Sequence, residues 1–340
     1  MLELLAWILI GLLLLSIVVL IPVFKVVSKI YPYSYTNARV RQMRSKLLSK
    51  QDFDDLLRRD YNDILYTLEN TNLPSLTKYL EADFAYSRVD TALRTHLVKD
   101  LSKLKRISPS ESMPLMSAIL SKYDIQVIEA IVRSQKTKLK NKKDILNITE
   151  VFSKDFIRQK KHDIEDLRNE LKNTKYEKIF EKHYRKIQKG EYKEFEEELD
   201  KYYFNRLKKA ASDQNTKTYV KRVIDNHNIA LVNQGEKACI PGGYLKIQVL
   251  NNTKTLDDLK NVINKKYSKF TANTKQELER ELYSQLETLG KKLMGKNPLG
   301  ESTITGYIAL KTANVRNLNI LLKMKSEGFS SAEIKKVMTK

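Results

Sequence analysis

The stretch YPYSYTNARVRQMRSKLL, residues 31–48, joins a long apolar run to a polar chain that is rich in helix-forming residues. Within it, Val40, Met43 and Leu47 recur at i, i+3 and i+7, the spacing that brings side chains onto one face of an α-helix. The charged side chains of the stretch fall on other faces. The pattern therefore predicts an amphipathic helix with one dry face, which needs a protein body to pack against.

The residues before this stretch predict a membrane anchor. LLAWILIGLLLLSIVVLIPVF, residues 4–24, contains no charged residue. At about 1.5 Å per residue, a helix of this length crosses the roughly 30 Å hydrocarbon layer of a bilayer. A cleaved signal peptide is the alternative, but the start MLE is not basic and the run ends in Pro-Val-Phe rather than in small residues. We predict one uncleaved transmembrane helix over residues 1–30.

Charge differs between the two sides of the apolar run. Glu3 is the only charged side chain before it, whereas five cations follow in residues 25–44. The positive-inside rule then predicts a single-pass protein of the cell membrane with its C-terminal body in the cytoplasm. Tyrosine rings and basic side chains both favour the head-group layer. We expect five residues here to contact lipid or a membrane ring: Tyr33, Tyr35, Arg39, Arg41 and Arg44.

The whole chain of 340 residues is strongly basic, with 62 Lys and Arg against 41 Asp and Glu. Such a balance implies an anionic partner, which could be lipid head groups, nucleic acid or an acidic protein surface. A single cysteine, Cys239, excludes an internal disulfide and indicates a reducing compartment for the body. The four histidines do not recur at metal-ligand spacing. We therefore expect no metal site and no cofactor.

Beyond residue 36 the chain reads as helix after helix, and the predicted fold class is all-α. Ser49 followed by Asp52 predicts a capping box at the start of one helix. An acidic helix opening of similar form then occurs three times, at Leu80–Phe84 (LEADF), Phe195–Leu199 (FEEEL) and Leu278–Leu282 (LEREL). Recurrence over such distances indicates an internal repeat.

Each opening is followed, 30 to 44 residues on, by a second pattern that consists of an apolar residue, Asp or Asn, three residues, and Ile or Leu. We predict that the polar residue caps a helix by accepting hydrogen bonds from the free N–H groups of the first turn. The three predicted caps, spaced by 101 and 89 residues, are Asp124, Asp225 and Asn314. The repeat predicts three similar helical domains that pack side by side, over residues 31–140, 141–239 and 240–340.

One glycine pattern imitates a nucleotide-binding loop. Residues 290–296, GKKLMGK, fit G-x4-G-K, but no strand precedes them and Asn297 stands where Ser or Thr would hold magnesium. We expect Gly290 and Gly295 to end the preceding helix instead. Pro241–Gly243 has the composition of a turn. Because no catalytic constellation follows from the sequence, we expect a protein without a catalytic site of its own.

Several of these stretches together resemble the C subunit of archaeal A-type ATP synthases, which is related to the d subunit of V-type ATPases. The resemblance runs from about residue 31 to the C-terminus, and both ends carry most of it. The matching stretches are Tyr33–Arg41 (YSYTNARVR), the helix patterns at Asp124 and Asp225, Pro241–Gly243 (PGG), residues 297–300 (NPLG), Tyr307–Lys311 (YIALK) and Asn314–Leu318 (NVRNL).

The resemblance implies a funnel of three pseudo-threefold-related helical domains on the cytoplasmic face of the membrane rotor ring. The funnel would receive the foot of the central shaft and couple the ring to it without catalysis. The implied partners are the proteolipid subunits of the ring, the shaft subunits and membrane lipid. The alternative is a membrane-anchored basic module that binds nucleic acid or anionic lipid, and such binding should weaken steeply with salt. The tyrosines fall mostly at helical spacing, so nucleic acid is not expected.

Three features depart from the family pattern. Asn314 stands where the family tends to carry an acid, a change that capping tolerates because Asn and Asp cap about equally well. Val127 replaces an asparagine that the other two patterns retain as Asn228 and Asn317. The apolar run of residues 4–24 is an addition, because typical members begin near Tyr33.

Overall fold

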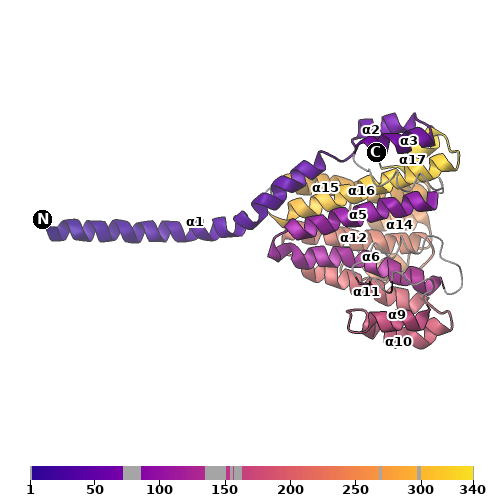
Figure 1. The fold of residues 1–340 in the computed structure, drawn as a ribbon, viewed down its shortest axis with the longest axis horizontal. Helices are drawn as coiled ribbons and strands as arrows, with labels where there is room; N and C mark the ends of the chain where they lie inside the picture. Colours follow the sequence, from indigo (N-terminus) through magenta and orange to yellow (C-terminus); the bar gives the residue numbers. More distant parts are fainter. Residues whose placement is uncertain are drawn as a thin grey trace.

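The computed structural model describes residues 2–71, 86–134, 151–153, 156, 163–267, 270–296 and 300–339. Over these residues the chain is helical and contains no strand, which confirms the all-α prediction (Figure 1). The helices are α1 (Leu2–Arg44), α2 (Lys50–Leu57), α3 (Tyr61–Thr71), α5 (Tyr86–Ile107), η1 (Ser110–Ser112), α6 (Met113–Arg133), α9 (Ile164–Leu171), α10 (Glu177–Gln188), α11 (Lys193–Ala210), α12 (Gln214–Asn233), α13 (Ile247–Asn251), α14 (Leu256–Asn264), α15 (Lys275–Lys296), α16 (Glu301–Ser326) and α17 (Ser331–Val337).

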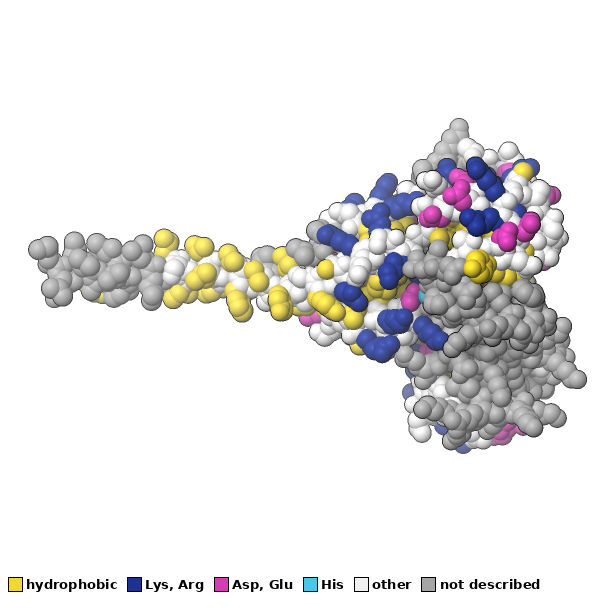
Figure 2. All heavy atoms as spheres, turned by 45° about the horizontal axis from the view of Figure 1, so that its top comes forward, with side chains coloured by type: hydrophobic (Ala, Val, Ile, Leu, Met, Phe, Trp, Pro, Cys, Tyr) yellow, Lys and Arg dark blue, Asp and Glu magenta, His cyan; other side chains and the backbone are white. Residues whose placement is uncertain are grey.

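The first helix is a stalk. α1 runs for 43 residues without interruption, across the predicted boundary at residue 30, and most of it projects away from the body (Figure 1). Its described side chains beyond the body are exposed and mainly apolar (Figure 2). By length and composition it is able to cross a membrane. Prolines inside a helix remove a hydrogen bond and kink it, and α1 contains Pro22 and Pro32.

The C-terminal end of α1 is built into the body. The hydroxyl of Thr36 donates to the carbonyl oxygen of Ile107 at the end of α5. The amide of buried Asn37 donates to the carbonyl of Gly300, just before α16, at 3.3 Å. Val40 is fully buried in the same place. Hydrogen bonds and apolar packing therefore fix the root of α1 to two helices from opposite ends of the chain.

Local sequence signals at this root are confirmed in part. Met43 is partly buried against the core that also contains Val40, as their shared face of α1 predicts. Leu47 packs against the same core, but α1 ends at Arg44 and Leu47 lies beyond the helix. The side chain of Ser49 accepts a hydrogen bond from the backbone of Asp52, and the carboxylate of Asp52 accepts one from the backbone of Ser49 at 2.6 Å. This capping box satisfies two free N–H groups at the start of α2.

Six long helices form a closed ring. In the order α5, α6, α11, α12, α15 and α16, each helix contacts the next, and α16 returns to contact α5. The helices converge toward the root of α1, while α2, α3 and α17 lie together at one outer edge of the wide part (Figure 1). The first and the last parts of the chain therefore meet where the ring closes.

Three clusters of buried apolar residues hold this arrangement together. The first combines residues 33–120 with residues 294–338, the second covers residues 115–240, and the third covers residues 229–282. These clusters cross the predicted domains over residues 31–140, 141–239 and 240–340, because the first cluster joins residues of the first and third, and the second cluster begins within the first. The difference arises because α16 and α17 bury their apolar faces against helices from the N-terminal part of the chain.

The prediction that Gly290 and Gly295 end a helix is wrong, because both lie inside α15. At Gly290 the helix passes very close to α16. A Cβ at this position would lie 2.8 Å from the Cβ of Ala309, and a Cβ on Gly306 would lie 2.7 Å from the carbonyl oxygen of Gly290. Gly290 is therefore required for close helix packing rather than for a loop.

Candidate functional site

A cavity of about 810 Å³ lies among five helices of the ring, α6, α11, α12, α15 and α16, and the segment after α12 closes part of its wall. A cleft or cavity between packed helices is a common place for a ligand or partner to bind. In the part of the chain that the structure describes, no group of three His, Cys, Asp or Glu side chains is arranged to hold a metal ion. The cavity is therefore best characterised by its shape and charge.

The cavity wall is acidic, although the chain as a whole is basic. Carboxylates outnumber cationic side chains, and both kinds come from several helices. The carboxylates are Glu129, Glu196, Glu197, Asp200, Glu236, Glu279 and Glu287, and the cations are Lys122, Arg133, Lys193, Lys237 and Arg316.

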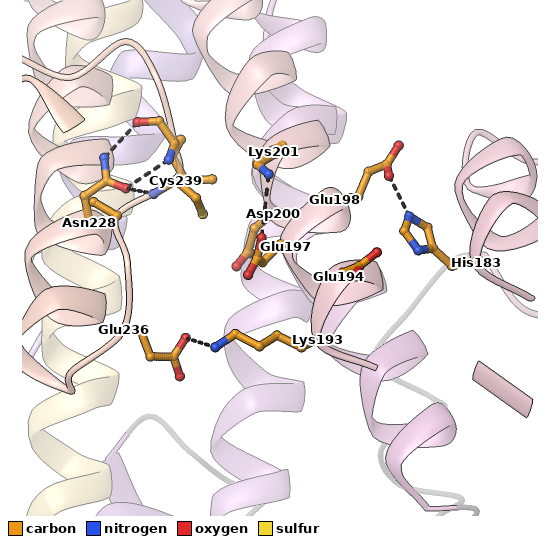
Figure 3. Close-up of polar contacts among 12 residues, drawn as sticks. His183, Lys193, Glu194, Glu197, Glu198, Asp200, Lys201, Asn228, Glu236 and Cys239 are labelled. Atoms are coloured by element: carbon orange, nitrogen blue, oxygen red, sulfur yellow. Dashed lines mark hydrogen bonds and ion pairs between the residues drawn. The ribbon is translucent and has the colours of Figure 1, made fainter. Parts of the chain in front are cut away.

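Three of the seven cavity carboxylates come from α11, a helix whose acidic side chains point to two sides (Figure 3). Toward α6, Glu196 pairs with Arg133 at 2.5 Å. Toward the segment after α12, Lys193 lies 3.7 Å from Glu236. On the other side of the helix, Glu198 is within 2.6 Å of a histidine on α10. The helix thus presents one acidic face to the cavity and braces its opposite face against α10.

Two carboxyl groups in the cavity have raised pKa values. Burial, together with the negative charges of Asp200 and Glu196, raises the pKa of Glu129 to about 8. Burial also raises the pKa of Asp200 to about 6, with Lys122 acting in the opposite direction. The imidazole of His227 lies 3.4 Å from the Asp200 carboxylate, and burial lowers its pKa to about 4. A cation that entered the cavity would favour ionisation of both carboxyl groups.

The prediction that Asp124, Asp225 and Asn314 cap helix N-termini is wrong. α6, α12 and α16 begin 11, 11 and 13 residues before them, so each of the three side chains lies inside a helix. All three are buried, and each forms a hydrogen bond with a group outside its own helix. The three residues nevertheless occupy almost the same place along three helices of the ring, as members of a repeat would.

The first two residues bind a tyrosine hydroxyl. Asp124 accepts hydrogen bonds from the hydroxyl of Tyr176 at 2.9 Å and from the ammonium of Lys175 at 3.1 Å. Asp225 accepts one from the hydroxyl of Tyr267. At the third position, the amide of Asn314 donates to the carbonyl oxygen of Leu48 at 2.9 Å. In each case a polar side chain inside a ring helix fixes a more distant segment.

The turn predicted at Pro241–Gly243 forms around Asp225, and Gly242 has a φ of +109°. The carboxylate accepts hydrogen bonds from the backbone N–H groups of Tyr244 at 2.8 Å and Leu245 at 3.1 Å. A Cβ on Gly243 would lie 2.0 Å from its oxygen. The loop can approach the carboxylate this closely only because residue 243 has no side chain.

Asn228 and Asn317, three residues after Asp225 and Asn314, also hold distant segments through hydrogen bonds. Asn228 accepts hydrogen bonds from the backbone of residues 239–240 and donates to the carbonyl at 240. Asn317 bonds to the backbone N–H and the hydroxyl of Thr339 in the same way. Val127 stands at the equivalent position three residues after Asp124 and is buried in an apolar cluster. At this position, therefore, Val127 contributes apolar packing where an asparagine would hold a backbone segment through hydrogen bonds.

One of the residues expected to contact the membrane region does not reach it. Tyr33 is buried, and its hydroxyl accepts a hydrogen bond from Ser112. Tyr33 packs into the body because it lies on the same face of α1 as the buried residues Thr36, Asn37 and Val40. Tyr35 is exposed, as are the three arginines on this helix, Arg39, Arg41 and Arg44.

The sequence prediction did not include the cavity residues. Lys122, Gln126, Glu129 and Arg133 recur at i, i+4, i+7 and i+11 and line one polar face of α6. This row of polar residues at helical spacing is the one feature of the sequence that could have indicated the cavity. The same spacing is also typical of a helix face that is exposed to water. Only the closure of the ring distinguishes a cavity wall from an outer surface.

Known proteins share the sequence that builds this body. The model of the family described as ATP synthase (C/AC39) subunit matches residues 36–337. The chain belongs to this family. The A-type ATP synthase C subunit of Thermococcus onnurineus is 25% identical over 92% of each chain. The C subunits from Methanosphaera stadtmanae and Methanocaldococcus jannaschii are 23% and 24% identical, over 94% of this chain and 91% and 89% of their own. The C/AC39 match begins after the apolar part of α1.

Proposed function

We propose that this C/AC39 family member is a non-catalytic subunit of the central stalk of an A-type ATP synthase. It would couple the membrane ring that moves ions to the shaft that carries rotation to the nucleotide-binding subunits. The observation that carries the proposal is the acidic cavity inside a closed ring of helices. A coupler needs a stiff body and a socket, and both follow from this arrangement.

The body is a funnel of three related units in this proposal. Its helices pair as α5 with α6, α11 with α12, and α15 with α16, each pair in contact. The second helix of each pair carries Asp124, Asp225 or Asn314 at nearly the same distance from its start. Two of the predicted acidic openings lie in the first turns of α11 and α15. The remaining one, Leu80–Phe84, lies outside the described residues.

The socket would hold the foot of the central shaft. An α-helix with its side chains is about 10 Å across, so a cavity of about 810 Å³ accommodates only about one to two turns of a helix tip. The excess of carboxylates favours a basic tip, and a bound cation would favour ionisation of Glu129, whose pKa burial raises to about 8. We expect Lys or Arg side chains of the shaft to enter here.

The end of the body that holds the root of α1 would face the membrane. Lys and Arg side chains gather on the part of the body next to the stalk (Figure 2). The exposed cations nearby include Arg39 on α1 and, at the ends of ring helices, Arg106, Lys209 and Lys296. This basic surface would lie against anionic head groups or the cytoplasmic loops of the ring. The C-terminal body is then cytoplasmic and the protein is anchored by one helix.

The first test is purification of the full chain from detergent-extracted membranes through a tag placed after Lys340. We expect the ring proteolipid and shaft subunits to accompany it, at low salt and at about 0.5 M salt, because packed apolar interfaces resist screening. Recovery of nucleic acid or anionic lipid alone, lost as salt rises, would support the alternative function instead.

The second test addresses the socket. Ala230 and Ala313 line the cavity, and replacing each with Trp fills it. We expect A230W/A313W to retain ring subunits but lose the shaft. Charge removal by E197Q/D200N should weaken shaft retention at low salt, and raising the salt should then cause a smaller additional loss than in the wild type. A matched control changes exposed carboxylates outside the cavity, D257N/E327Q, and should retain the shaft. Equal retention by all variants would contradict the socket, provided that circular dichroism shows each one folded.

A further inference from the structure

The connection between the stalk and the body is rigid. α1 is one continuous helix from Leu2 to Arg44. At its root, Thr36 and Asn37 bond to the ends of α5 and α16, and Val40 is fully buried between the packed helices. No loop or glycine separates the apolar part from this root. A proline can tilt the stalk, but it supplies no swivel. The stalk therefore turns whenever the body turns.

The connection is also short. Buried Tyr33 is nine positions after Phe24, the last residue of the apolar run, and nine helical steps span about 14 Å. The head-group layer on one side of a bilayer takes up about 5 to 8 Å of this length. The body is then held within about 10 Å of the head groups. A connection this short fixes the position of the helix relative to the body, whereas a flexible linker would let the helix change its position.

The direction of the stalk agrees with an axial position. The long helices of the body converge toward the root of α1, so the stalk leaves from the narrow end of the body (Figure 1). The exposed apolar side chains of Ile17, Val18, Val19 and Leu20 point in four directions around the helix. Among the side chains that the structure describes here, the exposed apolar groups are therefore spread around the helix rather than confined to one face.

We infer that α1 passes through the lumen of the membrane rotor ring and turns with it as an axial helix. The inference rests on the proposed function. A helix fixed to a rotating body but placed outside the ring would sweep through the membrane and strike the stator once in each turn. A helix inside the ring meets no stationary protein, because everything around it rotates at the same rate. The apolar surface of the stalk suits the inner wall of the ring and the lipid that fills it.

The test uses the complete complex, purified through a tag after Lys340, and electron cryo-microscopy. A small folded domain is fused before Met1 so that its density marks where α1 leaves the membrane. The matched preparation carries the same chain without the fused domain. We expect extra density on the rotor axis, on the face of the ring opposite the body, with a rod through the ring lumen in both preparations. ATP-driven ion transport should stay within about twofold of that of the unfused complex.

Several results would overturn the inference. Extra density beside the ring or against the stator would place α1 outside the lumen. Extra density on the side of the body would show that α1 does not cross the membrane, and loss of transport would show that the fused domain strikes a stationary subunit. Failure of the tagged chain to bring down ring and shaft subunits defeats the proposed function itself. Their recovery with the marker off the axis defeats only the axial position.

Discussion

Lys311 on α16 and Asp100 on α5 form a buried ion pair across the seam where the ring of helices closes, with Nζ 2.8 Å from Oδ2. Their side chains are only 11% and 15% exposed. His96 lies 3.1 Å from the same carboxylate oxygen. The pair joins a helix near the N-terminus to one near the C-terminus, so it helps decide whether the ring stays closed.

Replacing Asp100 with Asn should lower the free energy of unfolding by about 3 kcal/mol at pH 7, because it leaves the ammonium of Lys311 buried without its counter-charge. Burial acts to raise the pKa of Asp100, but the hydrogen bond from His96 and the charge of Lys311 outweigh it and hold the pKa well below its usual range. The stabilisation is therefore present above about pH 4 and is lost as the pH falls further. Urea unfolding at several pH values measures both effects.

A matched control is the exposed pair of Asp54 and Lys335, which joins α2 to α17 at 2.7 Å. Exposed pairs contribute little, because water and salt screen them. D54N should therefore unfold almost like the wild type. Equal losses in D100N and D54N would show that burial at the seam does not matter.

Replacing Gly306 with Ala should destabilise the protein by about 2 to 4 kcal/mol, because the new Cβ would lie 2.7 Å from the carbonyl oxygen of Gly290 and 2.9 Å from the backbone nitrogen of Met294. α15 and α16 would have to move apart. Gly295 lies on the same α15 with open space around it, so G295A should stabilise by up to about 1 kcal/mol through helix propensity. Thermal unfolding of the two variants should give shifts of opposite sign.

Replacing Asp225 with Ala should release the backbone N–H groups of Tyr244 and Leu245, which its carboxylate holds. Loss of a buried acceptor leaves these donors without a partner and should cost about 2 kcal/mol. N228A should instead release residues 239–240. Hydrogen–deuterium exchange of the segment 238–245 separates the two variants. Identical exchange patterns would contradict separate clamps.

Replacing Glu129 with Gln tests the charge state of the cavity. The folded-state pKa of about 8 lies above the usual carboxyl value of 4.5, so the wild type should lose stability as the pH rises from about 5 to 9. E129Q removes this loss and should be more stable than the wild type at pH 9 by about 2 kcal/mol, allowing for screening by water in the cavity. At pH 4 the two proteins should unfold alike. Parallel stability curves from pH 5 to 9 would contradict a raised pKa.

Some features were predictable because they depend on neighbours in the sequence. Ser49 and Asp52 form a capping box across one helical turn, and Val40 and Met43 share a face of α1. Such interactions need no knowledge of the rest of the chain.

The failed predictions concern residues whose role depends on a distant partner. Asp124 has the composition of a cap, but its hydroxyl donor is Tyr176, 52 residues away. Gly290 has the composition of a helix end, yet it permits the close approach of Gly306 from another helix. A polar side chain can cap a helix or bond to a distant segment, and a glycine can end a helix or allow close packing. Only the tertiary packing decides which of these roles the residue has.

The sequence by itself determined that the chain is helical, that it carries an apolar run long enough to cross a membrane, and that its pattern repeats. Hydrophobic periodicity and capping act over one or two turns, so these features are written locally. Only the tertiary structure decided that α16 returns to α5, that five helices surround a cavity with an excess of carboxylates, and that the stalk joins the body without a linker. These features depend on which distant helices bury their apolar faces together, and helix periodicity does not specify the partner.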